Sequence, residues 1–209
     1  SLHIPENEPI PASIADTLTF LDVSSPIRSL DHQKIRNIDA LVFFKNLELL
    51  NLNFNLIDDI RSLGHLKKLT VLSAQNNRIQ DISVMKELKN LQWLNLSSNE
   101  ISDISCLSSL TKLTDLTLWN NRVNNIKSLE ELKKLTSANL GKNFIKDISP
   151  LKNCKILKEL WLYGNPLANP EIISLLRRVQ LPFTVNQLAL SAGYVALDDE
   201  DFIALSLET

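Results

Sequence analysis

The side chains best suited to catalysis are few in this 209-residue chain and lie far apart in its sequence. Its three histidines, His3, His32 and His65, share no face of the sequence repeat, and the dipeptide Asp31-His32 alone is weak evidence for a general base. No nucleophile elbow, phosphate-binding loop or metal-ligand cluster occurs, and four glycines leave no glycine-rich loop. We therefore expect no catalytic residue, no cofactor and no metal ion.

One acidic run, Asp198-Asp199-Glu200-Asp201, could suggest a metal site. It lacks the spaced acidic ligands and the central glycine of a calcium-binding loop. Acidic residues that precede an apolar stretch more often cap a helix and complement its dipole. The helix-capping interpretation is therefore preferred for this segment.

Charge and cysteine content narrow the classes of partner. The net charge of −2 offers no clustered basic face for nucleic acid, and no apolar run of about 18 residues could span a membrane. Cys106 and Cys154 occupy different repeat positions two repeats apart, so we expect no disulfide. Two unpaired thiols and no visible leader favour the cytoplasm slightly over a bacterial surface. Because the chain starts at Ser1, however, the compartment stays unknown.

A leucine that recurs every 22 residues determines the architecture, and it occurs at Leu47, Leu69, Leu91, Leu113, Leu135 and Leu157. Counted from this leucine as position 1, residues 91–112 (LQWLNLSSNEISDISCLSSLTK) carry leucine at positions 4 and 6, Asn at 9 and Ile at 11 and 14. Such a period indicates a solenoid. We expect an α/β fold with one strand per repeat at positions 3 to 7, positions 4 and 6 inward, and short 3-10 or helical segments on the convex side.

Counting back from Leu47 places a degenerate first repeat at Ser25, with Leu30 at position 6 and Gln33 at position 9. This predicts about seven repeats over 25–165, an N-terminal cap at 1–24 and a C-terminal cap at 166–209, because terminal repeats would otherwise expose core. Within the caps, TLTFLDVS alternates like a strand, and Asn169-Pro170 predicts the start of a helix.

Three polar columns of the repeat are interpreted as architecture. Asparagines at position 9 are expected to hydrogen-bond the backbone of the neighbouring turn. Short polar residues at position 13 suit a turn or helix cap. Lysines at position 21 are expected to form a solvated edge.

The frame LxxLxLxxNxIxDIxxLxxLxx over roughly residues 25–165 resembles the 22-residue class of leucine-rich repeat found in the phosphatase-1 regulatory subunit family and in bacterial internalins. The sequence GNPL at 164–167 is similar to the junction at which many such arrays pass into a C-terminal cap. In both groups the concave face binds another protein: phosphatase catalytic subunits in the former and host-cell receptors in the latter. The resemblance therefore implies a non-catalytic protein-binding module, either a regulatory subunit or scaffold or a cell-surface receptor-binding domain.

The outward positions 3, 5 and 7 hold all three tryptophans and one of the two tyrosines. Trp and Tyr are enriched among interface hot spots, so we expect these positions to bind a partner. The predicted partner-binding residues are Trp93, Trp119, Trp161, Tyr163, Asp115, Asn139, Lys142 and Glu159.

The spacing predicts a trough on the C-terminal half of the concave face. Trp119 on the fifth strand and Trp161 and Tyr163 on the seventh would stand about 10 Å apart, since strands are about 4.8 Å apart. Between them, Ser137, Asn139 and Gly141 of the sixth strand would point outward and form a floor of small residues, and Ala138 replaces the usual inward leucine. Such a trough suits one inserted side chain or an extended peptide of a protein partner. We expect the chain alone to be a monomer. Carbohydrate binding is the alternative, because tryptophan faces beside Asn and Ser side chains also suit sugar rings.

Overall fold

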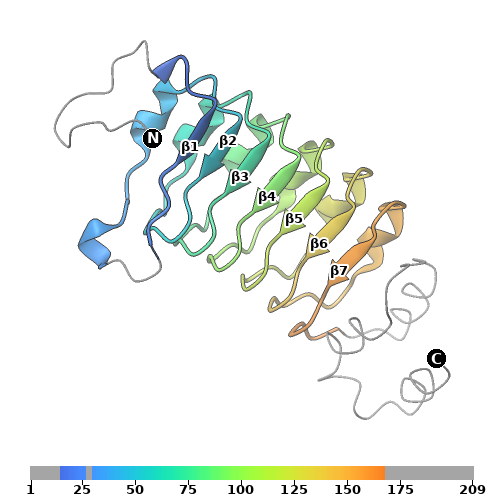
Figure 1. Ribbon diagram of the computed structural model, residues 1–209. Coiled ribbons are helices and arrows are strands. Elements are labelled where there is room, and N and C mark those ends of the chain that lie inside the picture. The colour runs from blue at the N-terminus through green and yellow to red at the C-terminus, as the bar shows by residue number, and fades with distance from the viewer. Residues whose placement is uncertain (1–14, 27–29, 168–209) are drawn as a thin grey trace, which may run out of the picture.

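The computed structural model describes residues 15–26 and 30–167, which form a parallel sheet with short 3-10 helices stacked behind it (Figure 1). The sheet has seven strands in chain order, so each strand lies between its sequence neighbours. They are β1 (Phe20–Asp22), β2 (Leu49–Asn51), β3 (Val71–Ser73), β4 (Trp93–Asn95), β5 (Asp115–Thr117), β6 (Ser137–Asn139) and β7 (Glu159–Trp161). This confirms the predicted solenoid with one strand per repeat.

The described residues also form short 3-10 helices. They are η1 (Asp31–Gln33), η2 (Asp39–Phe43), η3 (Arg61–His65), η4 (Ser83–Glu87), η5 (Ser105–Ser109), η6 (Lys127–Glu131) and η7 (Ser149–Asn153). Helices η2 to η7 stack in a row on the opposite side of the solenoid, whereas η1, which buries no residue, lies apart from that row (Figure 1). From η2 onward each begins at position 15 of its repeat and is only five residues long. A turn this short lets each repeat return to the sheet within 22 residues.

A single elongated core runs between the two layers, and the repeat at 91–112 shows its composition. Every apolar position of that repeat is at most 1% exposed: Leu91, Leu94, Leu96, Ile101, Ile104, Leu107 and Leu110. Burying one such side chain contributes about 2 kcal/mol, and neighbouring repeats share the buried surface. The predicted inward direction of positions 4 and 6 is confirmed.

The asparagine column at position 9 forms the predicted ladder. In the fourth repeat, Asn99 Nδ2 donates to the carbonyls of Ala74 (2.9 Å) and Leu96 (3.0 Å), and its Oδ1 accepts from Ile79 N–H (3.0 Å). Ala74 and Ile79 belong to the preceding repeat. Each asparagine therefore ties its own turn to the neighbouring one, and the same pattern recurs at Asn55, Asn77, Asn121, Asn143 and Asn165.

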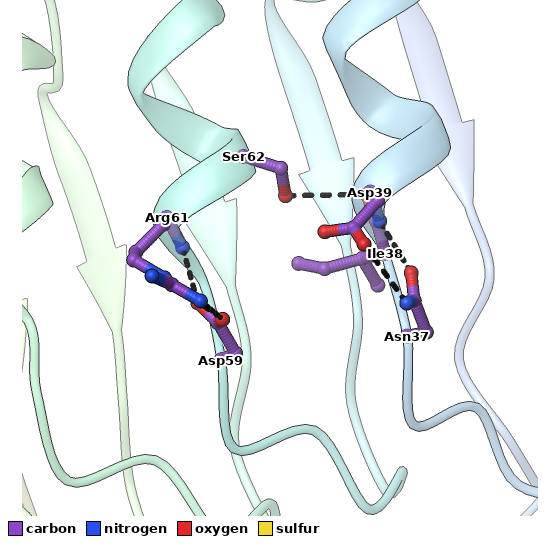
Figure 2. Close-up of polar contacts among 6 residues, drawn as sticks. All are labelled: Asn37, Ile38, Asp39, Asp59, Arg61 and Ser62. Carbon is purple, nitrogen blue, oxygen red and sulfur yellow. Dashed lines mark hydrogen bonds and ion pairs between the residues drawn. The ribbon is translucent and has the colours of Figure 1, made fainter.

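Position 13 confirms its predicted turn-capping role, as Figure 2 shows for two repeats. Asn37 Oδ1 accepts from Asp39 N–H (2.7 Å), and Asp59 Oδ1 accepts from Arg61 N–H (2.9 Å), each at the first residue of a 3-10 helix (Figure 2). Hydrogen bonds from the Arg61 side chain and backbone lower the pKa of Asp59. The column keeps the short helices in place and is part of the scaffold.

The first repeat departs from the predicted register. Its strand was expected at 27–31, but β1 is Phe20–Asp22, and Phe20 lies opposite Leu49, which is 29 residues later instead of 22. Leu30, expected inside the core at position 6, is 61% exposed, and Gln33 lies in η1. Val23 fills position 6, because its carbonyl accepts from Asn55 Nδ2 (2.9 Å). The extra residues lie between β1 and Ile35, so the strand-like alternation of TLTFLDVS was the correct signal.

Candidate functional site

The open face of the sheet, defined by positions 3, 5 and 7, carries every predicted site residue except Lys142, which is at position 8. Trp93, Asp115 and Glu159 are the first residues of β4, β5 and β7, while Asn139 and Trp161 are the last residues of β6 and β7. The 3-10 helices η2 to η7 stack along the other side (Figure 1), and the four aromatic residues are half-buried. Short strands in strict register thus present these side chains on one face.

Gly141 lies between two aromatic rings from neighbouring repeats. A Cβ atom at Gly141 would be 2.9 Å from Tyr163 Cε1 and 3.1 Å from Trp119 Cδ1. Both rings therefore extend over the glycine, and the space above it is narrower than the strand spacing alone predicts. Trp119, Gly141 and Tyr163 form one packed unit, which we call the aromatic cluster.

A cation and an unpaired donor distinguish Trp119. Lys142 Nζ lies 5.0 Å from the centroid of the Trp119 ring, a cation–π contact that contributes about 0.5–1 kcal/mol at an exposed site. Lys142 adopts a positive φ of 50°, as position 8 does in every repeat from Phe54 to Gly164. Trp119 Nε1 is buried with no hydrogen-bond partner in the described part of the chain.

The polar residues of the site are held by local hydrogen bonds. Asn139 Oδ1 accepts from Gly141 N–H (3.2 Å) and so shapes the turn under the aromatic cluster. Asp115 Oδ2 accepts from the Thr114 hydroxyl (2.6 Å), and Glu159 Oε2 accepts from the Ser137 hydroxyl (3.1 Å). Neither carboxylate forms an ion pair with a described residue.

Trp93 lies apart from the aromatic cluster. It occupies position 3 of β4, opposite Val71 of β3 and Asp115 of β5, whereas Trp119 and Tyr163 occupy position 7. The structure adds a neighbour to this end of the strands, since Phe20 of β1 is opposite Leu49 and 55% exposed. Sequence reasoning missed Phe20 because it placed Ile27 at position 3 of the first repeat; the alternation in TLTFLDVS could have found it.

Residues suited to catalysis are not brought together in the described part of the chain. His32 lies in η1 and His65 in η3, both exposed, and no group of His, Cys, Asp or Glu within residues 15–26 and 30–167 could hold a metal ion. No described helix is long and apolar enough to cross a bilayer. His3, the run Asp198–Asp201 and the helix expected at Asn169-Pro170 lie outside the described residues.

Replacing Gly141 by serine tests how tightly the aromatic cluster packs. We expect Gly141→Ser to displace the Tyr163 or Trp119 ring and change tryptophan fluorescence, because no room exists for a Cβ. The cost in unfolding free energy should be about 1–3 kcal/mol, as for other overpacked sites. Ser97→Gly, at position 7 of the fourth repeat and so away from the aromatic cluster, is the matched control. An unchanged emission spectrum for Gly141→Ser would contradict the packing described here.

The middle of the chain matches a known family of repeats. The sequence model of that family, leucine-rich repeats in two copies, matches residues 45–88 and 89–134. This chain is a leucine-rich-repeat solenoid. Its leucine-rich repeats resemble those of two internalins of Listeria monocytogenes. The match to inlF has 30% identity and a TM-score of 0.63, and it covers 81% of this chain and 55% of that one. The match to inlC2 has 26% identity and a TM-score of 0.59, and it covers 82% of this chain and 81% of that one. A leucine-rich-repeat protein of Leptospira interrogans shares the fold at 24% identity, with a TM-score of 0.58 over 81% of this chain and 50% of that one.

A second similarity is short. Forty residues are 65% identical to histidinol-phosphate aminotransferase 2 of Legionella pneumophila, and 40 are 50% identical to histidinol-phosphate aminotransferase 1 of Mannheimia succiniciproducens. The match covers 19% of this chain and spans only 11% of each aminotransferase. Such a segment cannot contain a complete enzyme domain.

Proposed function

We propose that this leucine-rich-repeat protein is a non-catalytic interaction module that binds a protein or peptide through aromatic residues on the open face of its sheet. The observation that carries the proposal is the packed cluster of Trp119, Gly141 and Tyr163 with Lys142 above the Trp119 ring. Rigid Trp and Tyr side chains give large contact area at low entropic cost, which is why they dominate interface hot spots. A solenoid of this kind offers one extended surface to its partner.

The pre-packed cluster supports binding more than a purely structural role. Core residues of the array are almost fully buried, whereas Trp119, Trp161 and Tyr163 remain half-buried on the sheet surface. An aromatic ring that stays partly wet gains further burial when a partner covers it. Asp115, Asn139 and Glu159 would then supply the polar rim, and Trp93 a separate apolar contact.

Substitution of two tryptophans tests the proposal. We expect Trp119→Ala/Trp161→Ala to weaken binding of a partner by at least about 30-fold, the size of a hot-spot loss of 2 kcal/mol, without unfolding the chain. Partners are recovered by pull-down from cell lysate, and affinity is then measured on each purified partner. Phe144→Ala removes a 58% exposed aromatic ring outside the open face and is the matched control.

Circular dichroism melts must first show that the variants fold equally. Equal affinity of wild type and double variant for a confirmed partner would contradict the proposed site. Loss of the fold in the double variant would show that these tryptophans belong to the scaffold.

The internalin similarity favours a second form of the same function. On that interpretation the chain is part of a bacterial surface protein whose open face binds a receptor. The chain spans only about half of the inlF structure that it matches. Testing binding to intact host cells separates this form from a regulatory subunit or scaffold inside the cell. For the chain by itself we propose a monomer with no cofactor, no metal and no catalytic residue, and a cap at each end.

A further inference from the structure

Position 3 forms one continuous row across all seven strands, which we call the position-3 row. Strand register places its members side by side in the order Phe20, Leu49, Val71, Trp93, Asp115, Ser137 and Glu159. Its first four members are apolar and its last three are polar or acidic. Phe20 is 55% exposed and Leu49 is 40% exposed, so the apolar half is open to solvent.

Two carboxylates in the row lack a cationic partner. Asp115 and Glu159 flank Ser137, and each accepts a single hydroxyl hydrogen bond, from Thr114 and Ser137 respectively. No described lysine or arginine pairs with them, although Lys158 precedes Glu159 in the chain. β5 and β7 are separated by two strand spacings, about 10 Å, so one cationic side chain above Ser137 would reach both carboxylates.

We propose that the position-3 row binds an extended segment of the protein partner whose apolar side chains lie over β1–β4 and whose Lys or Arg lies over Ser137. This inference rests on the proposed function and names the chemistry of its partner. The apolar half spans three strand spacings, about 14 Å, and its centre is about 17 Å from Ser137. At about 3.3 Å per residue, the basic residue lies about five positions from the centre of the apolar group, on either side of it in the sequence.

The width of the row favours an extended chain over a helix. Next to it, position 5 of β2, β3 and β4 carries the polar residues Asn51, Ser73 and Asn95. The apolar strip is therefore one side chain wide, whereas a bound helix presents an apolar face about 100° wide and is 10 Å or more across. A segment that crosses the strands leaves their backbone hydrogen bonds intact and is recognised by its side chains alone.

Random 12-residue peptides displayed on phage and selected on the immobilised 209-residue chain test this chemistry. We expect enrichment of an apolar pair with Lys or Arg about five residues away, before or after the pair. Peptides selected on Asp115→Asn/Glu159→Gln should lose the preference for Lys or Arg and keep the preference for apolar residues. Peptides selected on Phe20→Ser/Leu49→Ser should lose the apolar preference and keep the preference for Lys or Arg. For a synthetic enriched peptide, fluorescence polarisation should show at least a tenfold weaker affinity for either variant.

Matched controls come from the 3-10 helices. Glu131→Gln removes an exposed carboxylate from η6, and Phe43→Ser removes a 67% exposed ring from η2; both should select the same peptides as wild type. The single variant Glu159→Gln, at an exposed residue, repeats the charge test if the double variant melts early.

Each other result overturns the inference in a recognisable way. Peptides without a basic preference, or with the same preference on Asp115→Asn/Glu159→Gln, exclude recognition by the two carboxylates. If only Trp119→Ala/Trp161→Ala fails to bind the selected peptides, the proposed function stands but the position-3 row is not the binding site. A dimer in light scattering that Phe20→Ser abolishes would make the row a contact between copies. Enrichment of no peptide at all would count against both this inference and peptide binding by the open face.

Discussion

Asn99→Ala is expected to lower the free energy of unfolding by about 3 kcal/mol, because it leaves several buried backbone groups without partners. The side chain is 8% exposed and serves Ala74 and Leu96 carbonyls and the Ile79 N–H. Urea denaturation followed by circular dichroism measures the change.

Asn99→Asp separates the acceptor from the donor role of this amide. A carboxylate can still accept from Ile79 N–H but cannot donate to the two carbonyls, so this variant should also be destabilised. Asn124→Ala, at an exposed residue of the next repeat, is the matched control and should change stability by less than about 0.5 kcal/mol. A similarly small change for Asn99→Ala would show that the ladder does not hold neighbouring repeats together.

Alkylation of Cys106 is expected to be about 1,000-fold slower in the folded protein than in the unfolded chain. Burial, reinforced by the charge of Asp103, raises the pKa of this thiol from 9.0 to about 12. At pH 8 the reactive thiolate is then a fraction of about 10⁻⁴ instead of 10⁻¹. The Sγ also donates to the Ile82 carbonyl (3.1 Å), in the way that Ser62 Oγ donates to Ile38 two repeats earlier (Figure 2).

Iodoacetamide labelling of a Cys154→Ala variant, followed by mass spectrometry, measures the reaction at Cys106 alone. The rate in guanidinium chloride is the reference. Native labelling within tenfold of that rate would contradict a raised pKa. Labelling of Cys106→Ser, which retains Cys154, should also be slow, since burial raises the pKa of Cys154.

The same thiol gives stability a pH dependence of known sign. Between pH 9 and about 12 the unfolded chain loses the Cys106 proton and the folded chain keeps it. The folded state then binds more protons, so stability falls as pH rises through this window. Cys106→Ser should flatten this part of the pH profile.

Much of the fold follows from the repeat alone. Leucine at positions 1, 4 and 6 and isoleucine at 11 and 14 can be buried together only if successive repeats stack, because no single repeat encloses a core. The side-chain hydrogen bonds of Asn at position 9 and of Asp or Asn at position 13 can likewise be predicted, since each side chain bonds to backbone groups of its own repeat or of the preceding one. Both predictions are confirmed, for example at Asn99 and Asp59.

The register of the first repeat could not be obtained by counting. Extension of the 22-residue period placed Leu30 in the core, whereas the pairing of Phe20 with Leu49 puts Val23 at that position, partly buried against the core. An insertion between a strand and the next turn changes sequence spacing but leaves spatial spacing unchanged, because strands align through hydrogen bonds. For this reason the exposed Phe20 was missed.

The sequence by itself determined the solenoid, its one-strand repeat and the presence of all three tryptophans at outward positions. Only the tertiary structure decided how those side chains meet: Tyr163 and Trp119 close over Gly141, Lys142 lies above Trp119, and Trp93 joins a separate apolar row. The physical reason is that the period of the repeat specifies which face a residue occupies, whereas contacts on that face depend on side-chain volume and rotamer in neighbouring repeats. The missing Cβ at Gly141 therefore lets two rings pack together at the candidate site, and the 22-residue spacing alone does not predict this contact.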